Sequence, residues 1–173
     1  MRVDYSVARF ATLAILTSIV TSAGLSSRAG AAGQSVFATR CAICHQLNAQ
    51  GLPGMYPGLA GSIGSYVAVR DGRDYLVHIV LGGMSGPINV KGVTYNGLMP
   101  EFSQLSDAEI AATLNDVLTR FDAAHLPNDF APFATAEVAH ARAAHPTPAQ
   151  MAHERQSILD RIAHPARANE AAR

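Results

Sequence analysis

The chain has 173 residues, which is the length of one domain or of one domain with appendages. Its 13 basic and 13 acidic side chains cancel, and Trp is absent, which argues against a nucleic-acid-binding protein. Two cysteines cannot form a disulfide framework, and no apolar run reaches the ~18 residues of a membrane-spanning helix. Twelve of the 14 glycines lie between Gly33 and Gly97, and none follows.

Residues 1–32 have the parts of a secretory signal peptide. Two arginines in the first nine residues give a charged start, residues 10–20 (FATLAILTSIV) form a short apolar stretch, and small residues follow. We expect cleavage between Ala23 and Ala32, which would make the mature protein a periplasmic protein of a bacterium. The alternative is an uncleaved N-terminus that anchors the chain to a membrane.

The hydrophobic spacing predicts an all-α domain over residues 33–122 with a minor β-hairpin. The expected elements are, in chain order, a helix over 33–45, a loop over 46–72, a helix over 73–81, a hairpin over 87–95, a loop over 96–105 and a helix over 106–121. The last helix has a capping box, because Ser106 stands at its N-cap and Glu109 follows three residues later. The hairpin is expected to turn at Lys91-Gly92.

The composition changes after residue 122. Alanine dominates, glycine disappears, and five of the seven histidines lie in residues 123–173. We expect an Ala/His-rich helical tail with helices over 135–144 and 147–162, the second beginning with Thr147 as N-cap and Pro148 after it. This C-terminal extension either clasps a partner, such as a membrane complex, or packs back on the domain.

The chemistry-bearing motif is Cys41-Ala42-Ile43-Cys44-His45, a C-x-x-C-H run that is typical of covalent c-type haem attachment. On a helix, Cys41 and Cys44 project from the same side and can reach the two vinyl groups of one porphyrin edge. His45 follows at once, so its imidazole can turn under the iron. A thioredoxin-type pair needs βαβ context, and a structural zinc site needs four ligands. Neither condition is met, so we expect one covalent haem c with its iron.

A closed haem site needs a second axial ligand on the iron, and methionine sulfur is the ligand that we expect. Met99 stands in the loop Tyr95-Asn96-Gly97-Leu98-Met99-Pro100, where Pro100 restricts the backbone and Gly97 allows a close approach. Met84 is the rival. Met55 is too near the proximal loop, and Met151 lies in the tail.

From residue 33 to about residue 121 the sequence resembles a class I c-type cytochrome, a small monohaem electron carrier. The resemblance rests on the CAICH run, the Pro57-Gly58-Leu59-Ala60-Gly61 segment, the loop ending in Met99-Pro100 and the SDAEIAATLNDVLTRF helix. It implies a small cytochrome c fold wrapped around one covalent haem.

The resemblance also implies roles for four residues besides the ligands. The Pro57 carbonyl would accept the second N–H of the His45 ring, which fixes the ring. Leu59 would pack on the haem edge. Tyr95 and Asn96 are candidates for hydrogen bonds to the Met99 sulfur or to a haem propionate, and the sequence does not assign which.

Two features depart from relatives of this kind. The family commonly places an aromatic residue in the middle of its last helix, but Asp116 stands there, and we expect Phe121 or Phe37 to fill the gap. Lys91 is the only lysine, so a ring of lysines for docking on an acidic partner is not supported.

We therefore expect an electron-transfer protein and no enzyme. It would pass electrons between a dehydrogenase or respiratory complex and an acceptor such as a terminal oxidase, and a partner would meet an apolar haem edge. One alternative is a haem c subunit of a membrane or periplasmic dehydrogenase or oxidase complex, bound through the tail. Another is a haem peroxidase or gas sensor, which needs an open sixth position on the iron.

Overall fold

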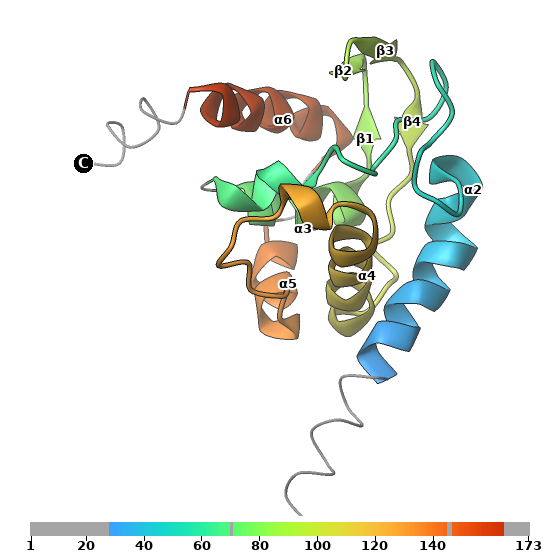
Figure 1. Cartoon of the computed structure of the whole chain (residues 1–173), viewed down its shortest axis with the longest axis vertical. Helices are drawn as coiled ribbons and strands as arrows, with labels where there is room; N and C mark the ends of the chain where they lie inside the picture. The colour runs from blue at the N-terminus through green and yellow to red at the C-terminus, as the bar shows by residue number, and fades with distance from the viewer. Residues whose placement is uncertain (1–27, 70, 145–146, 165–173) are drawn as a thin grey trace, which may run out of the picture.

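The computed structural model describes residues 28–69, 71–144 and 147–164, and this part of the chain is mainly helical (Figure 1). Residues 28–36 are α-helical. The elements that follow are η1 (Phe37–Cys41), α2 (Ala42–His45), η2 (Gly64–Ala68), α3 (Gly72–Gly82), β1 (Met84–Ser85), β2 (Ile88–Val90), β3 (Val93–Tyr95), β4 (Leu98–Met99), α4 (Asp107–Phe121), η3 (Ala123–His125), α5 (Thr135–Arg142) and α6 (Pro148–Ala163). Most of the predicted signal peptide lies outside the described residues, so its cleavage stays a prediction.

The first helix is continuous from residue 28 to His45 and crosses α4 at close range. Gly33 permits the crossing, because a Cβ atom there would overlap the carbonyl oxygen of Ala112 in α4. The helix predicted over 33–45 is confirmed, with one difference: η1 is a π-helical segment, which widens the turn just before Cys44. Such segments are frequent at functional sites.

Two phenylalanines complete this crossing in place of the aromatic residue that Asp116 replaces. The rings of Phe37 and Phe121 lie 5.2 Å apart, as expected. The Arg120 guanidinium lies 4.3 Å from the centroid of the Phe121 ring and 2.6 Å from the Asp116 carboxylate. Burial raises the pKa of Asp116, while the nearby Arg120 opposes the rise. Arg120 therefore balances the negative charge of the Asp116 carboxylate, which lies at the crossing of the first helix with α4.

The short strands form two separate pairs. In the predicted hairpin, β2 pairs with β3 in antiparallel register around Lys91 and Gly92, both of which have positive φ. The other pair, β1 with β4, joins Met84 to Met99. The loop predicted over 96–105 is corrected here, because Leu98 and Met99 form β4; a two-residue strand is too short to show periodicity. The loop predicted over 46–72 likewise contains η2.

The predicted capping box of α4 is present. The Ser106 hydroxyl accepts the Glu109 backbone N–H, and the Glu109 carboxylate accepts the Ser106 backbone N–H at 2.8 Å. At the other end, buried Asp122 accepts the backbone N–H groups of Ile63 and Gly64 at 2.7 and 2.6 Å. This carboxylate fixes the start of η2 against the end of α4.

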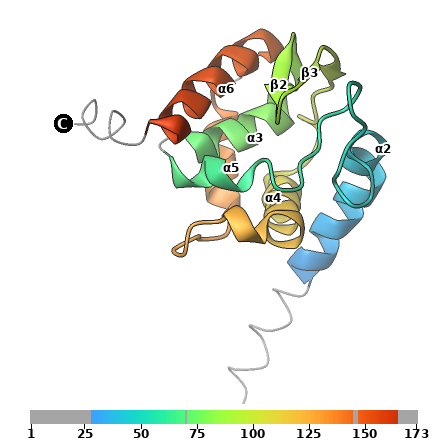
Figure 2. The same cartoon turned by 45° about the horizontal axis from the view of Figure 1, so that its top comes forward.

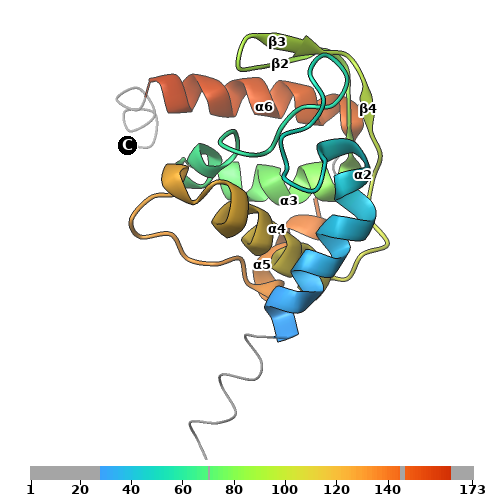
Figure 3. The same ribbon diagram turned by 45° about the vertical axis from the view of Figure 1, so that its right-hand side comes forward.

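The described part of the tail, residues 123–144 and 147–164, packs back on the domain. Figure 3 shows α6 lying along α3, with α4 and α5 on the other side of α3. Five tail side chains are buried in the main core: Phe133, Val138, Ala141, Met151 and Ile158. Arg73 of α3 donates to both carboxylate oxygens of Glu137 in α5 at 2.6 and 2.8 Å. The helices predicted over 135–144 and 147–162 are thus α5 and α6, and they are part of the folded body.

The hairpin and the loop after α2 stand next to each other on one side of the molecule (Figure 2). The Lys91 ammonium donates to the Ala60 carbonyl at 3.3 Å and ties the hairpin turn to this loop. Within the described ranges, no helix has the length and apolar character to cross a membrane.

Candidate functional site

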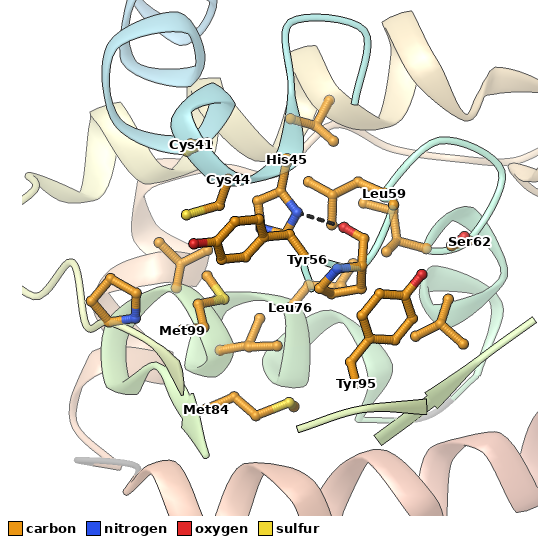
Figure 4. Close-up of a pocket in the computed structure, with 18 of the residues that line it drawn as sticks. Cys41, Cys44, His45, Tyr56, Leu59, Ser62, Leu76, Met84, Tyr95 and Met99 are labelled. Carbon is orange, nitrogen blue, oxygen red and sulfur yellow. Dashed lines mark hydrogen bonds between the residues drawn. The ribbon is translucent and has the colours of Figure 1, made fainter. Parts of the chain in front are cut away.

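A cavity of about 410 Å³ opens between the end of α2, α3 and the two strand pairs. Its walls are mostly apolar, with side chains that include Leu59, Leu76, Ile79, Val80, Phe102, Leu114 and Val117. Figure 4 shows Cys44 and His45 reaching in from α2, with Met99 and Met84 on the side of the strands. The predicted motif and the predicted methionine therefore line the same cavity.

Cys41 and Cys44 are both half-buried, line the cavity and form no disulfide bond with each other. Burial, with a smaller contribution from neighbouring Cys44, raises the pKa of the Cys41 thiol to about 11. Reactive cysteines of dithiol oxidoreductases have lowered pKa values, because the thiolate is their nucleophile. A protonated Cys41 thiol is therefore unlike a thioredoxin-type pair.

His45 ends α2 and is buried, with 9% of its surface exposed. Its Nδ1 lies 2.8 Å from the Pro57 carbonyl oxygen, as the resemblance to class I c-type cytochromes implied. Because a carbonyl oxygen only accepts, Nδ1 carries the proton and Nε2 keeps a free lone pair. Burial lowers the pKa of His45, although the Pro57 carbonyl opposes the shift. The imidazole is therefore neutral and oriented, as a metal ligand must be.

The loop after α2 places the Pro57 carbonyl. The chain reverses at Gln46 and Ala49, which both have positive φ, and the His45 carbonyl accepts the Gly51 N–H at 2.9 Å. Gly51 has a φ of +69°, and a Cβ atom there would overlap the Tyr56 carbonyl oxygen and the Pro57 carbonyl carbon. Glycine is therefore required at this turn by both its backbone and its surroundings.

Met84 and Met99 are directly opposite each other in the β1–β4 pair, and both line the cavity. Residues opposite each other in an antiparallel pair place their side chains on the same face. In Figure 4, Met99 lies nearer to Cys44 and His45 than Met84 does. Met84 is buried, whereas Met99 is half-buried. The geometry thus favours Met99 as a partner for His45 and keeps Met84 as its neighbour.

Of the other predicted residues, the structure brings three to the cavity and leaves one outside. Pro57, Leu59 and Tyr95 line it, and Tyr95 is buried. Asn96 is exposed and is not among the lining residues, so its predicted contact with the Met99 sulfur or a haem propionate has no support here. Its chain neighbour Tyr95 ends β3 facing inward, which turns Asn96 outward because successive side chains alternate.

The lining residues that were not predicted from the sequence include Tyr66, Tyr75 and Arg155. The rings of Tyr66 and Tyr75 are stacked 5.4 Å apart, and the positive charge of Arg155 in α6 acts on both hydroxyls. Burial raises the pKa of both tyrosines. No local sequence pattern places these side chains near the C-x-x-C-H motif. Arg155, for example, follows the motif by more than a hundred residues.

The donor set fits a haem better than a bare metal ion. Two thiols stand beside a neutral imidazole, a thioether lies across an apolar cavity, and together they match the ligands of cytochromes c. Within the described ranges, no group of three or more His, Cys, Asp and Glu side chains is placed to hold a metal ion. A structural zinc site would need four such ligands.

Comparison with known proteins agrees with this donor set. A family model described as Cytochrome c matches residues 30–119. Cytochrome c-552 from Thermus thermophilus is 44% identical over 126 residues, which are 73% of this chain and 95% of the relative. A second cytochrome c-552 of the same species is 45% identical over 130 residues, which are 75% of this chain and 87% of the relative.

The chain therefore belongs to the cytochrome c family. Its fold is the small cytochrome c fold with a minor hairpin and a C-terminal helical extension. As a member of the family, it carries covalently bound haem c with its iron and transfers electrons instead of converting a substrate.

Proposed function

We propose that this cytochrome is an exported, periplasmic electron carrier with one haem ligated by His45 and Met99. Cys41 and Cys44 hold the haem through thioether bonds, and Pro57 orients His45. The observation that carries the proposal is the 2.8 Å bond from Nδ1 of His45 to Pro57, which frees Nε2 toward a cavity that Met99 also lines. The bound haem supplies one-electron chemistry, with its iron alternating between Fe(II) and Fe(III).

The protein's own residues set how easily that electron is taken up. A thioether is a soft ligand, so Met99 favours Fe(II) and raises the reduction potential relative to ligation by two histidines. The Pro57 carbonyl keeps the imidazole ring in one orientation. The apolar walls, including Leu76, Val80 and Leu114, exclude water from the site.

An apolar patch supports the proposed contact with redox partners. Its exposed side chains are Ile43, Leu47, Leu52, Met55 and Leu98, which are between 45% and 73% exposed. Ile43, Met55 and Leu98 also line the cavity, so these three exposed apolar side chains lie at its edge. Large exposed apolar groups that cluster in this way mark interaction sites. We propose that a donor such as a dehydrogenase or respiratory complex, and an acceptor such as a terminal oxidase, dock here through apolar surfaces of their own.

Two alternatives receive less support. A subunit held in a larger complex through its tail needs α5 and α6 to be available, yet their apolar side chains are packed into the core of the domain. A peroxidase or gas sensor needs an open position on the iron, and Met99 is placed to fill it.

Replacing Met99 tests the proposed ligand. We expect Met99→Ala to abolish the weak long-wavelength band that sulfur–iron ligation gives the oxidised protein, and to allow prompt carbon monoxide binding after reduction. Met84→Ala is the matched control, because it removes the neighbouring thioether and should leave the band in place. Survival of the band in Met99→Ala together with its loss in Met84→Ala would assign the ligand to Met84.

A further inference from the structure

The end of α3 lies against the backbone that carries Met99. Gly83 follows α3 directly, and its N–H donates to the Ile79 carbonyl at 3.1 Å, which closes the helix. A Cβ atom on Gly83 would overlap the Met99 carbonyl oxygen and would lie 2.9 Å from the Pro100 carbonyl carbon. The two segments can approach each other this closely only because residue 83 has no side chain.

Backbone contacts on both sides of this close approach hold the same segment. Before it, Met84 and Met99 are opposite each other in the β1–β4 pair (Figure 1). After it, the Phe102 N–H donates to the Val80 carbonyl at 2.9 Å. Val80 stands in the last turn of α3, where carbonyl groups lack partners within the helix. The backbone around Met99 is therefore held against α3 and β1 by contacts within the protein.

The backbone conformation of Gly83 is also one that other residues adopt only at a cost. Its φ is +69° and its ψ is −167°, a region that is essentially restricted to glycine. Gly83 is buried, yet it is not among the residues that line the cavity. A side chain at residue 83 would therefore act on the cavity through the backbone that it crowds, which is the backbone of Met99.

We propose that Gly83 is a positioning residue for the axial methionine. Its close contact with the backbone of residues 99–101 fixes how far the Met99 sulfur reaches into the cavity, before any bond to iron forms. This inference rests on the proposed ligation by His45 and Met99. A ligand that the protein already holds in place loses little further freedom on binding, so its bond to the iron is stronger than that of a mobile methionine.

Competition by imidazole measures the strength of the methionine bond in the oxidised, full-length holoprotein. Imidazole takes the place of the thioether on the iron, so the weak long-wavelength band disappears as imidazole binds. We expect Gly83→Ala to lower the apparent dissociation constant of imidazole by about tenfold, because the competing Met99 bond is weakened by the same factor. The midpoint potential should fall as well, since a weaker thioether bond favours Fe(II) less.

Gly92→Ala is the matched control for this substitution. Gly92 also has a positive φ, +83°, but its Cβ would meet nothing within 4 Å, and it does not line the cavity. Its imidazole affinity and midpoint potential should coincide with those of the wild type. If Gly83→Ala lowers the free energy of unfolding but binds imidazole with wild-type affinity, Gly83 has only a structural role and the inference is overturned.

A second measurement keeps the test decisive if Gly83→Ala fails to mature. Hydrogen exchange of the Phe102 amide is followed in the wild-type holoprotein, with and without saturating imidazole. We expect this amide to stay protected after imidazole has displaced the methionine, because the end of α3 holds the segment. Loss of the protection would show that the iron bond holds the segment instead, and would overturn the inference. A wild-type protein without the long-wavelength band would contradict ligation by Met99 itself, so the two failures are distinguishable.

Discussion

Single backbone groups decide the chemistry of His45. The Pro57 carbonyl selects the tautomer, and it reaches Nδ1 because the chain turns at Gly51. The C-x-x-C-H motif could be predicted from the spacing of its residues, and the role of Pro57 was implied by the resemblance to class I c-type cytochromes. The positive φ of Gln46 and Ala49 could not, because these residue types seldom adopt that conformation and nothing local requires it.

Gly51→Ala tests the turn that presents Pro57. We expect a loss of stability of about 1–3 kcal/mol, because the new Cβ meets the Tyr56 carbonyl oxygen while φ stays positive. Thermal or denaturant unfolding of the holoprotein measures the change. Gly54→Ala is the control, because Gly54 also has a positive φ, +76°, but its Cβ would meet nothing within 4 Å. Equal losses in both variants would show that crowding at Gly51 plays no part.

At the scale of elements, helices with strong caps could be predicted to within a few residues. The helix expected over 106–121 is α4, with its capping box at Ser106, and the helix expected over 147–162 is α6, with Thr147 as its N-cap. The π-helical segment η1, the 3-10 helix η2 and the two-residue strands could not be predicted, because each is shorter than the window in which periodicity becomes visible. Tertiary contacts, such as Asp122 with the start of η2, fix these short elements instead.

The contact between α3 and α5 gives a pH-dependent prediction. The hydrogen bond with Arg73 lowers the pKa of Glu137. The stability that Glu137 contributes is therefore complete above its unfolded pKa, near 4.5, and is lost as pH falls through its folded value. We expect Glu137→Gln to lower the free energy of unfolding by about 1 kcal/mol at pH 7 and to have little effect below that range. Chemical denaturation at pH 7 and in acid measures both.

The control for this prediction is Glu101→Gln, which neutralises an exposed carboxylate. It should change stability by less than about 0.5 kcal/mol at either pH. A deficit of Glu137→Gln that stayed constant down to strong acid would contradict the assigned ion pair with Arg73.

At the scale of the whole molecule, the tail belongs to the same core as the haem-binding half. The composition change after residue 122 could be predicted from the sequence. The docking of α5 and α6 could not, because it depends on which face of α3 the rest of the domain leaves uncovered. Met151 and Ile158 of α6 are buried together with Leu76 and Val77 of α3. The change in composition at residue 122 therefore does not divide the hydrophobic core into two parts.

Ile158→Ala tests whether the tail and the domain unfold together. Ile158 has no exposed surface, so truncation should destabilise the whole protein by about 2–5 kcal/mol in a single transition. Ser157→Ala, on the exposed side of α6, should stay within about 0.5 kcal/mol of the wild type. Unfolding followed by both haem absorbance and far-ultraviolet circular dichroism gives the comparison. An early, separate loss of helix signal in Ile158→Ala would show that the tail is an independent appendage.

The pyridine haemochrome spectrum of the purified protein tests the central claim most directly. The protein is expressed in a host with a working haem-ligation system, and the haem is assayed after extraction with acidified solvent. We predict one haem per chain that resists extraction and has the spectrum of a porphyrin with both vinyl groups converted to thioethers. A colourless protein, or haem that is extracted freely, would contradict attachment at Cys41 and Cys44.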